Sequence, residues 1–299
     1  MFTSFKIEQK SVNGIKINYR IGGDGPPLLL LHGHPQTHVI WHKVADKLAA
    51  NFTVVAADLR GYGDSDKPAL SEQAQAYSKR EMAKDQVELM EQLGFNHFSL
   101  IAHDRGARVA HRMQLDHPQS IKRMVLLDIA PTLSMYRQTN EEFARAYWHW
   151  FFLIRPAPLP ESLIEADPEN YLRSVMGTRS AKMAPFTDDA FAEYLRCISL
   201  SGAARGICED YRASASIDLV HDQQDVDSHH KVSCPLMVLW GEHGTVGKCF
   251  DPIAEWQKVA VNVCGGELPS GHYIPEEAPE LLLERVSEFF ANTEKESFN

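Results

Sequence analysis

Short apolar runs recur along the first half of the chain, and longer amphipathic stretches separate them. A short unbroken apolar run is typical of a strand that is buried on both faces. Such runs fall at residues 27–31, 53–57, 98–102 and 124–127. Helix-compatible stretches lie between them at residues 39–49, 79–93 and 105–117. The alternation of strands with helices predicts an α/β fold with a mostly parallel, doubly wound sheet.

The start of the chain has a different pattern. Residues 4–10 and 15–20 have strand character and flank Asn13-Gly14. Both residues of an Asn-Gly pair tolerate positive φ, which makes the pair a strong signal for a tight turn between two strands. The sequence therefore predicts an antiparallel hairpin before the first buried strand.

The strand rhythm stops after Asp128. Residues 131–230 contain no buried-strand run, and helix-compatible stretches fall at 141–152, 161–165 and 189–198. The rhythm then resumes with an apolar run at 235–240, a helix at 252–258, a short strand near 261–264 and a closing helix at 279–291. We expect a core made of residues 1–130 and 231–299, with residues 131–230 inserted as a helical cap that roofs an active site.

Composition narrows the classes of partner. The chain has 299 residues and a formal net charge of −10, which argues against a nucleic-acid partner because phosphate binding needs a basic face. Neither a signal-peptide pattern nor an apolar run long enough for a membrane span is found. The five cysteines are odd in number and form no CxxC pair. Reduced thiols in a cytoplasmic protein are therefore expected, rather than a disulfide framework or a zinc site.

A candidate nucleophile stands where a predicted strand meets a predicted helix, in the segment Ala102-His103-Asp104-Arg105-Gly106. In a turn of the form small-x-nucleophile-x-glycine, the central side chain is strained and exposed above the sheet. An aspartate there attacks sp³ carbon and leaves an alkyl ester, which water must cleave with the help of a base. The alternative is that Asp104 only caps the helix, whose dipole favours an anion.

The candidate base is His272, in the loop that follows the last predicted strand. The chain has 14 histidines, and position alone distinguishes this one. An acid is then needed to orient the imidazole and hold its tautomer. Asp128 directly follows the strand at 124–127 and is assigned that role, and Glu242, after the strand at 235–240, is the rival. The alternative for Asp128 is a turn or helix cap.

Arg105 and Arg108 lie three positions apart at the start of the predicted helix, so they can share a face. Two guanidinium groups beside Asp104 would form a clamp for a carboxylate and would keep Asp104 ionised. A substrate of the form X–CH₂–COO⁻ would then present its α-carbon to Asp104. The alternative for both arginines is ordinary salt bridging at the surface.

Several motifs make the chain resemble the fluoroacetate (haloacetate) dehalogenases of the α/β-hydrolase superfamily. The specific ones are His103-Asp104-Arg105-Gly106-Ala107-Arg108 and Tyr147-Trp148-His149-Trp150, supported by Asp128-Ile129-Ala130-Pro131-Thr132 and Cys208-Glu209-Asp210-Tyr211-Arg212-Ala213. Two further motifs, His32-Gly33-His34-Pro35-Gln36 and Asp58-Leu59-Arg60-Gly61-Tyr62-Gly63, are shared with epoxide hydrolases. The similarity runs from about residue 14 to residue 279.

The resemblance implies an α/β-hydrolase fold and hydrolysis of a haloacetate to glycolate and halide, without a metal or an organic cofactor. It implies that His149, Trp150 and Tyr211 hold the leaving halide. Backbone amides near His34 and Arg105 would stabilise the oxyanion of ester hydrolysis. The expected partners are a small anionic substrate and the halide product. Members of this family tend to be homodimers, so a homodimer is expected.

The chain departs from the family pattern in two places. His34 replaces the more usual phenylalanine and adds a titratable group near the nucleophile. Residues 174–180 lack a tryptophan that members of the family often carry there to shape access to the pocket. The second departure puts substrate size and the preference for fluoride in doubt.

Two other functions compete with the dehalogenase interpretation. An epoxide hydrolase would use the same nucleophile and base together with tyrosines of the cap to protonate the epoxide oxygen. The candidates are Tyr147, Tyr171, Tyr194 and Tyr211. A binding module on the same fold is also conceivable, but it has no need of Asp104, Asp128 and His272 together at catalytic positions.

Overall fold

Eight strands form one sheet in the computed structural model, which describes residues 1–69 and 71–291. The sheet order is β1-β2-β4-β3-β5-β6-β7-β8. The strands are β1 (Lys6–Val12), β2 (Ile15–Gly22), β3 (Pro27–Leu31), β4 (Thr53–Ala57), β5 (Phe98–His103), β6 (Ile121–Leu127), β7 (Leu236–Gly241) and β8 (Val263–Leu268). The predicted hairpin is confirmed, since β1 pairs antiparallel with β2 across Asn13 and Gly14, both at positive φ. Strand β2 is antiparallel to β4, and all later pairings are parallel.

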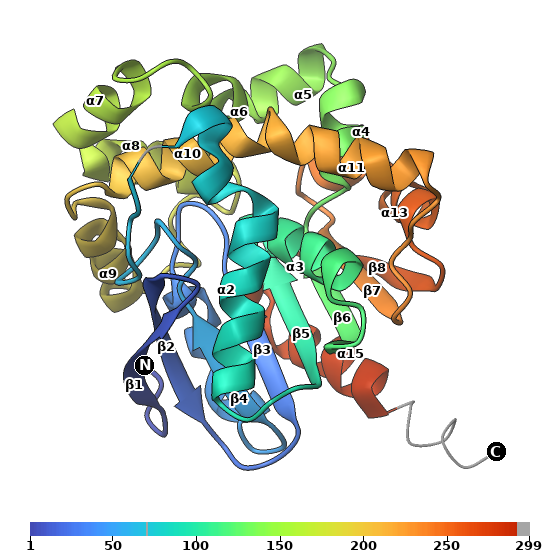
Figure 1. The fold of residues 1–299 in the computed structure, drawn as a ribbon. Helices are drawn as coiled ribbons and strands as arrows, with labels where there is room; N and C mark the ends of the chain where they lie inside the picture. Colours follow the sequence, from blue (N-terminus) through green and yellow to red (C-terminus); the bar gives the residue numbers. More distant parts are fainter. Residues whose placement is uncertain (70, 292–299) are drawn as a thin grey trace.

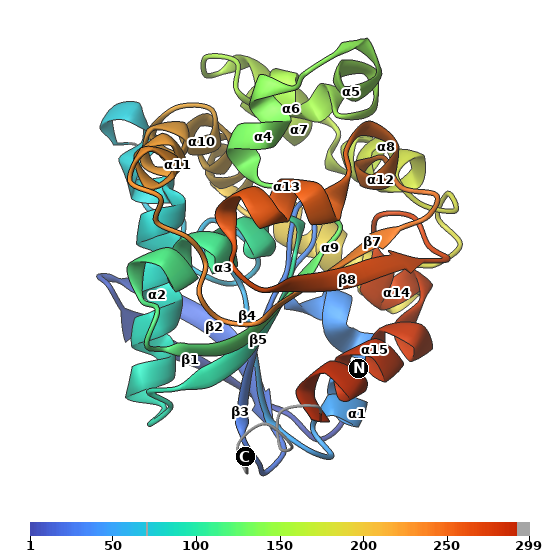
Figure 2. The ribbon, with the colours of Figure 1, turned by 90° about the vertical axis from the view of Figure 1, so that its right-hand side faces the viewer.

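Alternate residues of the central strands belong to two separate apolar cores. Leu29 and Leu31 of β3 lie in one core, and Leu28 and Leu30 lie in the other. Helices α2 (Lys79–Gln92), α3 (Asp104–Asp116) and α13 (Pro252–Val259) cover the first face of the sheet. The short helices η1 (His38–Lys43) and α1 (Ala45–Leu48), with α14 (Ile274–Glu277) and α15 (Pro279–Ala291), cover the second face (Figure 2). Both faces are therefore buried, as the unbroken apolar runs predicted.

The segment between β6 and β7 is helical and lies at the end of the sheet where α3 begins (Figure 1). Its helices are α4 (Thr132–Arg137), α5 (Glu141–Ala146), α6 (Trp148–Leu153), α7 (Leu159–Ala166), α8 (Pro168–Thr178), α9 (Asp188–Ile198), α10 (Ala203–Ser214) and α11 (Ile217–Asp227). Helix α10 packs against α6, α7 and η2 (Glu72–Tyr77). Within the described ranges, no helix is both long and apolar enough to cross a membrane.

Three predicted elements differ from the observed ones. The stretch 141–152 is two helices, because the backbone turns at Tyr147 (φ −105°, ψ 33°). The stretch 39–49 is a 3₁₀ helix followed by the short α1. The strand near 261–264 begins later, at Val263, and runs through Gly265 and Gly266 to Leu268. Val261 is 72% exposed and takes no part in the strand.

Candidate active site

Asp104 occupies the sharp turn between β5 and α3 and is fully buried. Its φ is +46°, a left-handed conformation that a non-glycine residue adopts only under strain. The turn is also crowded, because the N–H of Gly106 donates to the carbonyl of His32 and an added Cβ at Gly106 would lie 2.7 Å from the carbonyl of Leu31. The strained and crowded turn is the geometry expected of a nucleophile elbow.

The two carboxylate oxygens of Asp104 have different neighbours. Oδ1 accepts a hydrogen bond of 3.0 Å from the backbone N–H of His34. Oδ2 lies 3.6 Å from Nε2 of His272 and 3.6 Å from Nη2 of Arg179, and no hydrogen bond to it is found among the described residues. Burial alone would raise the pKa of Asp104, but His272 and Arg179 outweigh it and hold that pKa well below its usual value. Oδ2 is therefore an ionised oxygen that is free to attack.

His272 is oriented by a buried carboxylate. Its Nδ1 lies 2.5 Å from Oδ2 of Asp128, whose other oxygen accepts from the N–H of Gly241 at 3.0 Å. Donation from Nδ1–H to Asp128 leaves Nε2 as the acceptor that faces Asp104. Nε2 of His103 lies 2.8 Å from the carbonyl of His272 and supports the loop. The rival acid, Glu242, is exposed.

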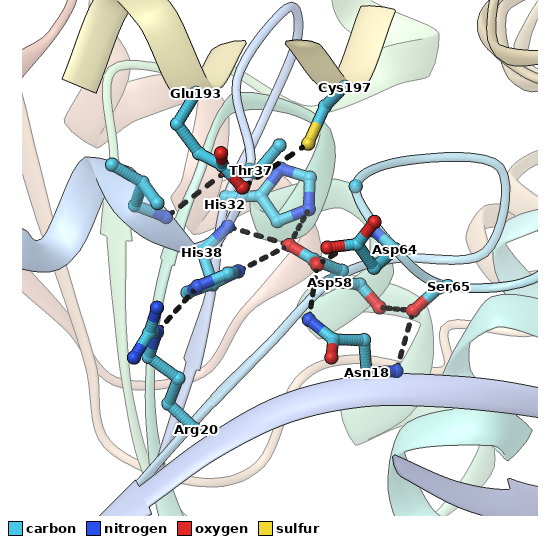
Figure 3. A network of polar contacts seen from close by, with 12 residues as sticks. Asn18, Arg20, His32, Thr37, His38, Asp58, Asp64, Ser65, Glu193 and Cys197 are labelled. Atoms are coloured by element: carbon cyan, nitrogen blue, oxygen red, sulfur yellow. Dashed lines mark hydrogen bonds and ion pairs between the residues drawn. The ribbon is translucent and has the colours of Figure 1, made fainter. Parts of the chain in front are cut away.

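The loop that supplies the His34 N–H is fixed by a buried aspartate, Asp58 (Figure 3). Oδ1 of Asp58 accepts from the backbone N–H of His38 and lies 2.8 Å from its ring Nδ1, and Oδ2 accepts from the amide of Asn18 at 2.8 Å. Burial opposes ionisation of Asp58, yet His38 and His32 lower its pKa. Nε2 of His32 accepts from the N–H of Leu59, which anchors the other side of the loop.

Arg105 is less free than the sequence suggested. Its Nε and Nη2 donate to the carboxylate of Asp210 at 2.9 and 2.8 Å, and Nη2 also reaches the hydroxyl of Ser214. Lys79 binds the same carboxylate. Arg105 is therefore held by a carboxylate that it shares with Lys79, and the principal cation that keeps Asp104 ionised is Arg179 rather than the predicted pair of Arg105 and Arg108. Only Nη1 of Arg105 has no partner in the described chain.

Arg108 is buried among uncharged acceptors. Its Nη1 donates to Oγ1 of Thr132 at 2.9 Å and to the carbonyl of Ala130 at 3.2 Å, and its Nη2 approaches the sulfur of Met135. Its Nε is a buried N–H without a partner in residues 1–69 and 71–291. The guanidinium lies 4.7 Å from the centre of the Trp150 ring, so it faces the segment between β6 and β7.

The three predicted halide donors lie close together above the arginines. The rings of His149 and Trp150, on α6, lie 5.9 and 6.4 Å from the ring of Tyr211, on α10. The guanidinium of Arg105 is 4.0 Å from the centre of the Tyr211 ring. Nε2 of His149, Nε1 of Trp150 and the hydroxyl of Tyr211 are buried and lack a hydrogen-bond partner wherever the chain is described. Buried polar atoms are nearly always paired, so this grouping points to a polar ligand.

His34 is not a titrating group at ordinary pH. Burial lowers the pKa of His34 to about 3, so the ring is neutral in the range in which most enzymes work. Nε2 of His34 lies 3.0 Å from the hydroxyl of Tyr171, and the ring stacks on His149 at 6.0 Å. The sequence predicted that His34 adds a titratable group near Asp104. Burial instead keeps the ring uncharged, so His34 adds no charge there at ordinary pH.

Two residues at the site were not identified from the sequence. Arg179, at the end of α8, contacts both Asp104 and His272 and lies within the segment 174–180 that lacks the family tryptophan. Asp210 lies one position before Tyr211 and holds Arg105. Each could have been found only from the tertiary contact, because isolated arginines and aspartates on helices usually face solvent.

A cavity of about 160 Å³ adjoins the site on the side of His272. Its walls include Asp128, Arg179, His243 and His272, with the loop at 178–181. Asp104 does not line it. Arg179, which contacts Asp104, therefore lies between this cavity and Asp104.

One cluster of possible metal ligands is found among the described residues. Asp64, Glu193 and Cys197 bring three possible ligand atoms within 4.8 Å of one another. Arg196 already pairs with both carboxylates, at 2.6 and 2.7 Å, and the group lies beside the Asp58 network (Figure 3). An acidic pair that a guanidinium neutralises is not a site for a cation.

The chain is similar to known hydrolases over nearly its whole length. A family described as "alpha/beta hydrolase fold" matches residues 26–279. A fluoroacetate dehalogenase of Burkholderia sp is 41% identical over 98% of this chain and 96% of its own length. A soluble epoxide hydrolase of Corynebacterium sp. (strain C12) is 35% identical over 97% of this chain and 99% of its own. The crystal structure of a protein from Nostoc sp PCC 7120, described as an alpha/beta hydrolase, is 53% identical with a TM-score of 0.95, covering 97% and 99% of the two chains.

Proposed function

Because the chain belongs to the alpha/beta hydrolase family, we propose that it is a hydrolytic dehalogenase that converts a haloacetate to glycolate and halide. The reaction would pass through an ester on Asp104. The observation that carries the proposal is an ionised aspartate, rather than a serine, at the nucleophile turn, facing a histidine base. Buried N–H and O–H donors without partners support a site for an anionic leaving group.

In the first step, Oδ2 of Asp104 attacks the α-carbon of the substrate. The new bond is carbon to Oδ2, and the bond that breaks is carbon to halogen, whose electron pair leaves with the halide. His149, Trp150 and Tyr211 would donate to the halide as charge develops on it. Attack from the side opposite the halide inverts the carbon. Nη1 of Arg105 and Nε of Arg108, which have no partner in the described residues, would hold the substrate carboxylate.

In the second step, water cleaves the ester. Nε2 of His272 takes a proton from the water, whose oxygen attacks Cγ of Asp104, and the imidazolium is stabilised by Asp128. The negative charge that develops on Oδ1 would be met by the backbone N–H of His34, which already donates to that oxygen at 3.0 Å. The bond between Cγ and Oδ2 then breaks, and Oδ2 leaves as the hydroxyl oxygen of glycolate, with the proton that His272 took from the water. The second proton of the water passes to solvent, and Asp104 is regenerated as a carboxylate that contains the oxygen of the water.

Residues 131–230 would act as a cap in this reaction. They carry the three proposed halide donors and Arg179, and they lie at the end of the sheet where Asp104 stands (Figure 1). Exclusion of water by the cap during the first step would strengthen the electrostatic interactions inside the site. A homodimer remains a prediction, which light scattering of the purified protein would test.

An epoxide hydrolase is the second candidate, supported by the Corynebacterium relative. Of the tyrosines predicted for that role, Tyr171 is bonded to His34 and Tyr194 to Glu276. The hydroxyl of Tyr211 is the one of these four that is buried and unpaired within the described ranges. A single phenol can still protonate an epoxide oxygen. The choice between the dehalogenase and the epoxide hydrolase therefore depends on which substrate the protein converts.

The test is halide release from fluoroacetate and chloroacetate, with styrene oxide as the epoxide control. Halide from either acid supports the dehalogenase, and diol without halide would establish the epoxide hydrolase instead. Asp104→Ala should abolish turnover, whereas Asp189→Ala, at an exposed aspartate, should not. His272→Gln should release one equivalent of halide and leave a carboxymethyl ester on the Asp104 peptide in the mass spectrum. Failure to find that ester would refute the assigned roles.

A further inference from the structure

Arg179 reaches the catalytic pair from the end of α8. Its Nη2 lies 2.5 Å from Nε2 of His272 and 3.6 Å from Oδ2 of Asp104. Its side chain is only 6% exposed, and its Nη1 is buried without a hydrogen-bond partner in the described chain. The backbone carbonyl of Arg179 also accepts the N–H of His272 at 2.8 Å, so the residue is tied to the base loop independently of its guanidinium.

The contact to His272 uses the atom that catalysis needs. A neutral imidazole has one acceptor nitrogen, and Nδ1–H of His272 is directed to Asp128. The acceptor is therefore Nε2, and the N–H of Arg179 points at its lone pair. Water cannot transfer a proton to that lone pair while the guanidinium occupies it. Arg179 must move off Nε2 before the ester is hydrolysed.

The charge of Arg179 is less compensated than that of Arg105. Arg105 has a bidentate carboxylate partner in Asp210, at 2.8 and 2.9 Å. The carboxylate that Arg179 faces is that of Asp104, whose Oδ2 at 3.6 Å is too far for a hydrogen bond. A desolvated guanidinium with free N–H groups binds a carboxylate strongly.

Arg179 also borders the cavity of about 160 Å³ beside the base, while Asp104 does not. An anion that enters from the cavity meets Arg179 before it meets the nucleophile. Its carboxylate would draw the guanidinium away from Nε2 of His272, and its α-carbon would then lie toward Oδ2 of Asp104.

We propose that Arg179 binds the carboxylate of the substrate and, by doing so, releases His272 to act as a base. The inference rests on the proposed aspartyl-ester chemistry and assigns its substrate class as compounds with a carboxylate next to the reacting carbon. Arg179 then adds to Arg105 and Arg108 in distinguishing an acid from its neutral amide. In the absence of a carboxylate the base stays occupied.

The experiment compares halide release from bromoacetate with that from bromoacetamide, which has the same leaving group and no charge. Arg179→Gln should lower kcat/KM for bromoacetate on the order of 100-fold, as expected when a desolvated charge pair loses one partner. KM should rise more than kcat falls, whereas steady-state bromide release from bromoacetamide should not fall, because the variant no longer has a guanidinium on Nε2 of His272. Arg179→Lys should restore part of the loss. Arg173→Gln, which removes an exposed arginine from the same helix, is the matched control.

The possible results distinguish a failure of the role proposed for Arg179 from a failure of the proposed dehalogenase function. An equal loss with both substrates would overturn the inference, because Arg179 would then serve the halide or the fold, yet the dehalogenase would stand. An unchanged rate with bromoacetate in Arg179→Gln would also overturn it. If the unaltered protein releases bromide from neither compound, the proposed function falls and the inference falls with it.

Discussion

Asp104 has one oxygen engaged by a backbone amide and one that faces His272, and in the proposed mechanism this asymmetry gives each oxygen a different role. Oδ1, bonded to the N–H of His34, is placed to become the carbonyl oxygen of the ester. Oδ2, without a hydrogen bond among the described residues, is placed to form the bond to carbon. In the proposed second step water attacks Cγ, and Oδ2 leaves with glycolate. The ¹⁸O of labelled water should therefore enter the carboxylate of Asp104 first and appear in glycolate only in a later turnover.

His34 gives a prediction about acid stability. The folded protein keeps His34 neutral down to about pH 3, whereas an unfolded histidine takes up a proton near pH 6.5. Protons therefore favour unfolding, and stability is lost as the pH falls below 6.5. His34→Phe should remove about 2 kcal/mol of this loss between pH 6.5 and pH 5, measured by denaturant unfolding.

The control for this prediction is Tyr171→Phe. It removes the hydrogen bond to Nε2 of His34 but keeps the imidazole, so its pH dependence should follow that of the unaltered protein. If His34→Phe and the unaltered protein lose stability in parallel between pH 6.5 and pH 5, the buried ring is not the cause.

At the scale of single residues, sequence position identified the candidates whose place depends on the order of strands. Asp104, Asp128 and His272 each follow a strand, so the apolar runs locate them. Asp210 lies on α10 and Arg179 follows the last residue of α8, both in the segment between β6 and β7, where no strand register fixes their direction. Their contacts depend on how α8 and α10 pack, which local pattern does not encode.

At the scale of elements, the loop after β3 approaches the nucleophile turn closely, and Gly33 makes this possible. An added Cβ at Gly33 would lie 2.8 Å from Oδ1 of Asp104 and 2.9 Å from the backbone nitrogen of Arg105. Neither the turn nor the loop can retreat easily, because Asp58 fixes the loop and the strained turn begins α3. The short distance keeps the His34 N–H on Oδ1.

Gly33→Ala should therefore slow ester hydrolysis. The loop must shift, and the hydrogen bond from His34 to Oδ1 lengthens. Loss of one such donor slows comparable reactions by about 100- to 1,000-fold. Ester on Asp104 should accumulate during turnover and appear in the intact-protein mass spectrum.

Gly266→Ala serves as the matched control, because an added Cβ there meets no heavy atom within 4 Å in the described structure. It should leave turnover unchanged. A normal steady-state rate in Gly33→Ala, with the protein folded, would show that the loop does not need this close approach.

Element boundaries were predictable where side chains carry the signal. The apolar runs of β3, β4 and β5 mark strands that are buried on both faces. Strand β8 was placed too early because Gly265 and Gly266 interrupt its pattern, and glycine disfavours strands. The break at Tyr147 was missed because the residues on both sides of it are compatible with one helix. The turn places α5 and α6 in contact.

At the scale of the whole molecule, one buried carboxyl joins three separate parts of the chain. Glu276, on α14, bonds to the hydroxyl of Tyr194 on α9 and to the amide of Gln36, in the loop before η1. The backbone carbonyl of Glu276 accepts from Lys43 at 2.7 Å. Burial raises the pKa of Glu276 to about 8, although the hydrogen bonds oppose the rise.

This raised pKa predicts that the protein loses stability toward alkaline pH. The folded state holds the proton up to about pH 8, whereas the unfolded state releases it near pH 4.5. The contribution is complete below pH 4.5 and decreases by about 1.4 kcal/mol for each pH unit up to about pH 8. Glu276→Gln keeps a neutral group and should flatten this slope in unfolding measurements between pH 5 and pH 8.

The amide of Gln36 can turn to suit the new side chain, because its Oε1 has no partner in the described residues. Glu280→Gln, at an exposed glutamate of α15, is the control and should keep the slope. Equal slopes in all three proteins would mean that Glu276 is ionised when folded.

The unpaired polar atoms around Asp104 have a consequence for laboratory evolution. They are buried donors and acceptors that no described residue satisfies, among them Nε2 of His149, Nε1 of Trp150 and the hydroxyl of Tyr211. Such atoms weaken a fold until a ligand meets them. Variants selected for heat resistance alone should therefore carry apolar residues at these positions early in the selection. The positions that change in this way would mark the binding site before any substrate is known.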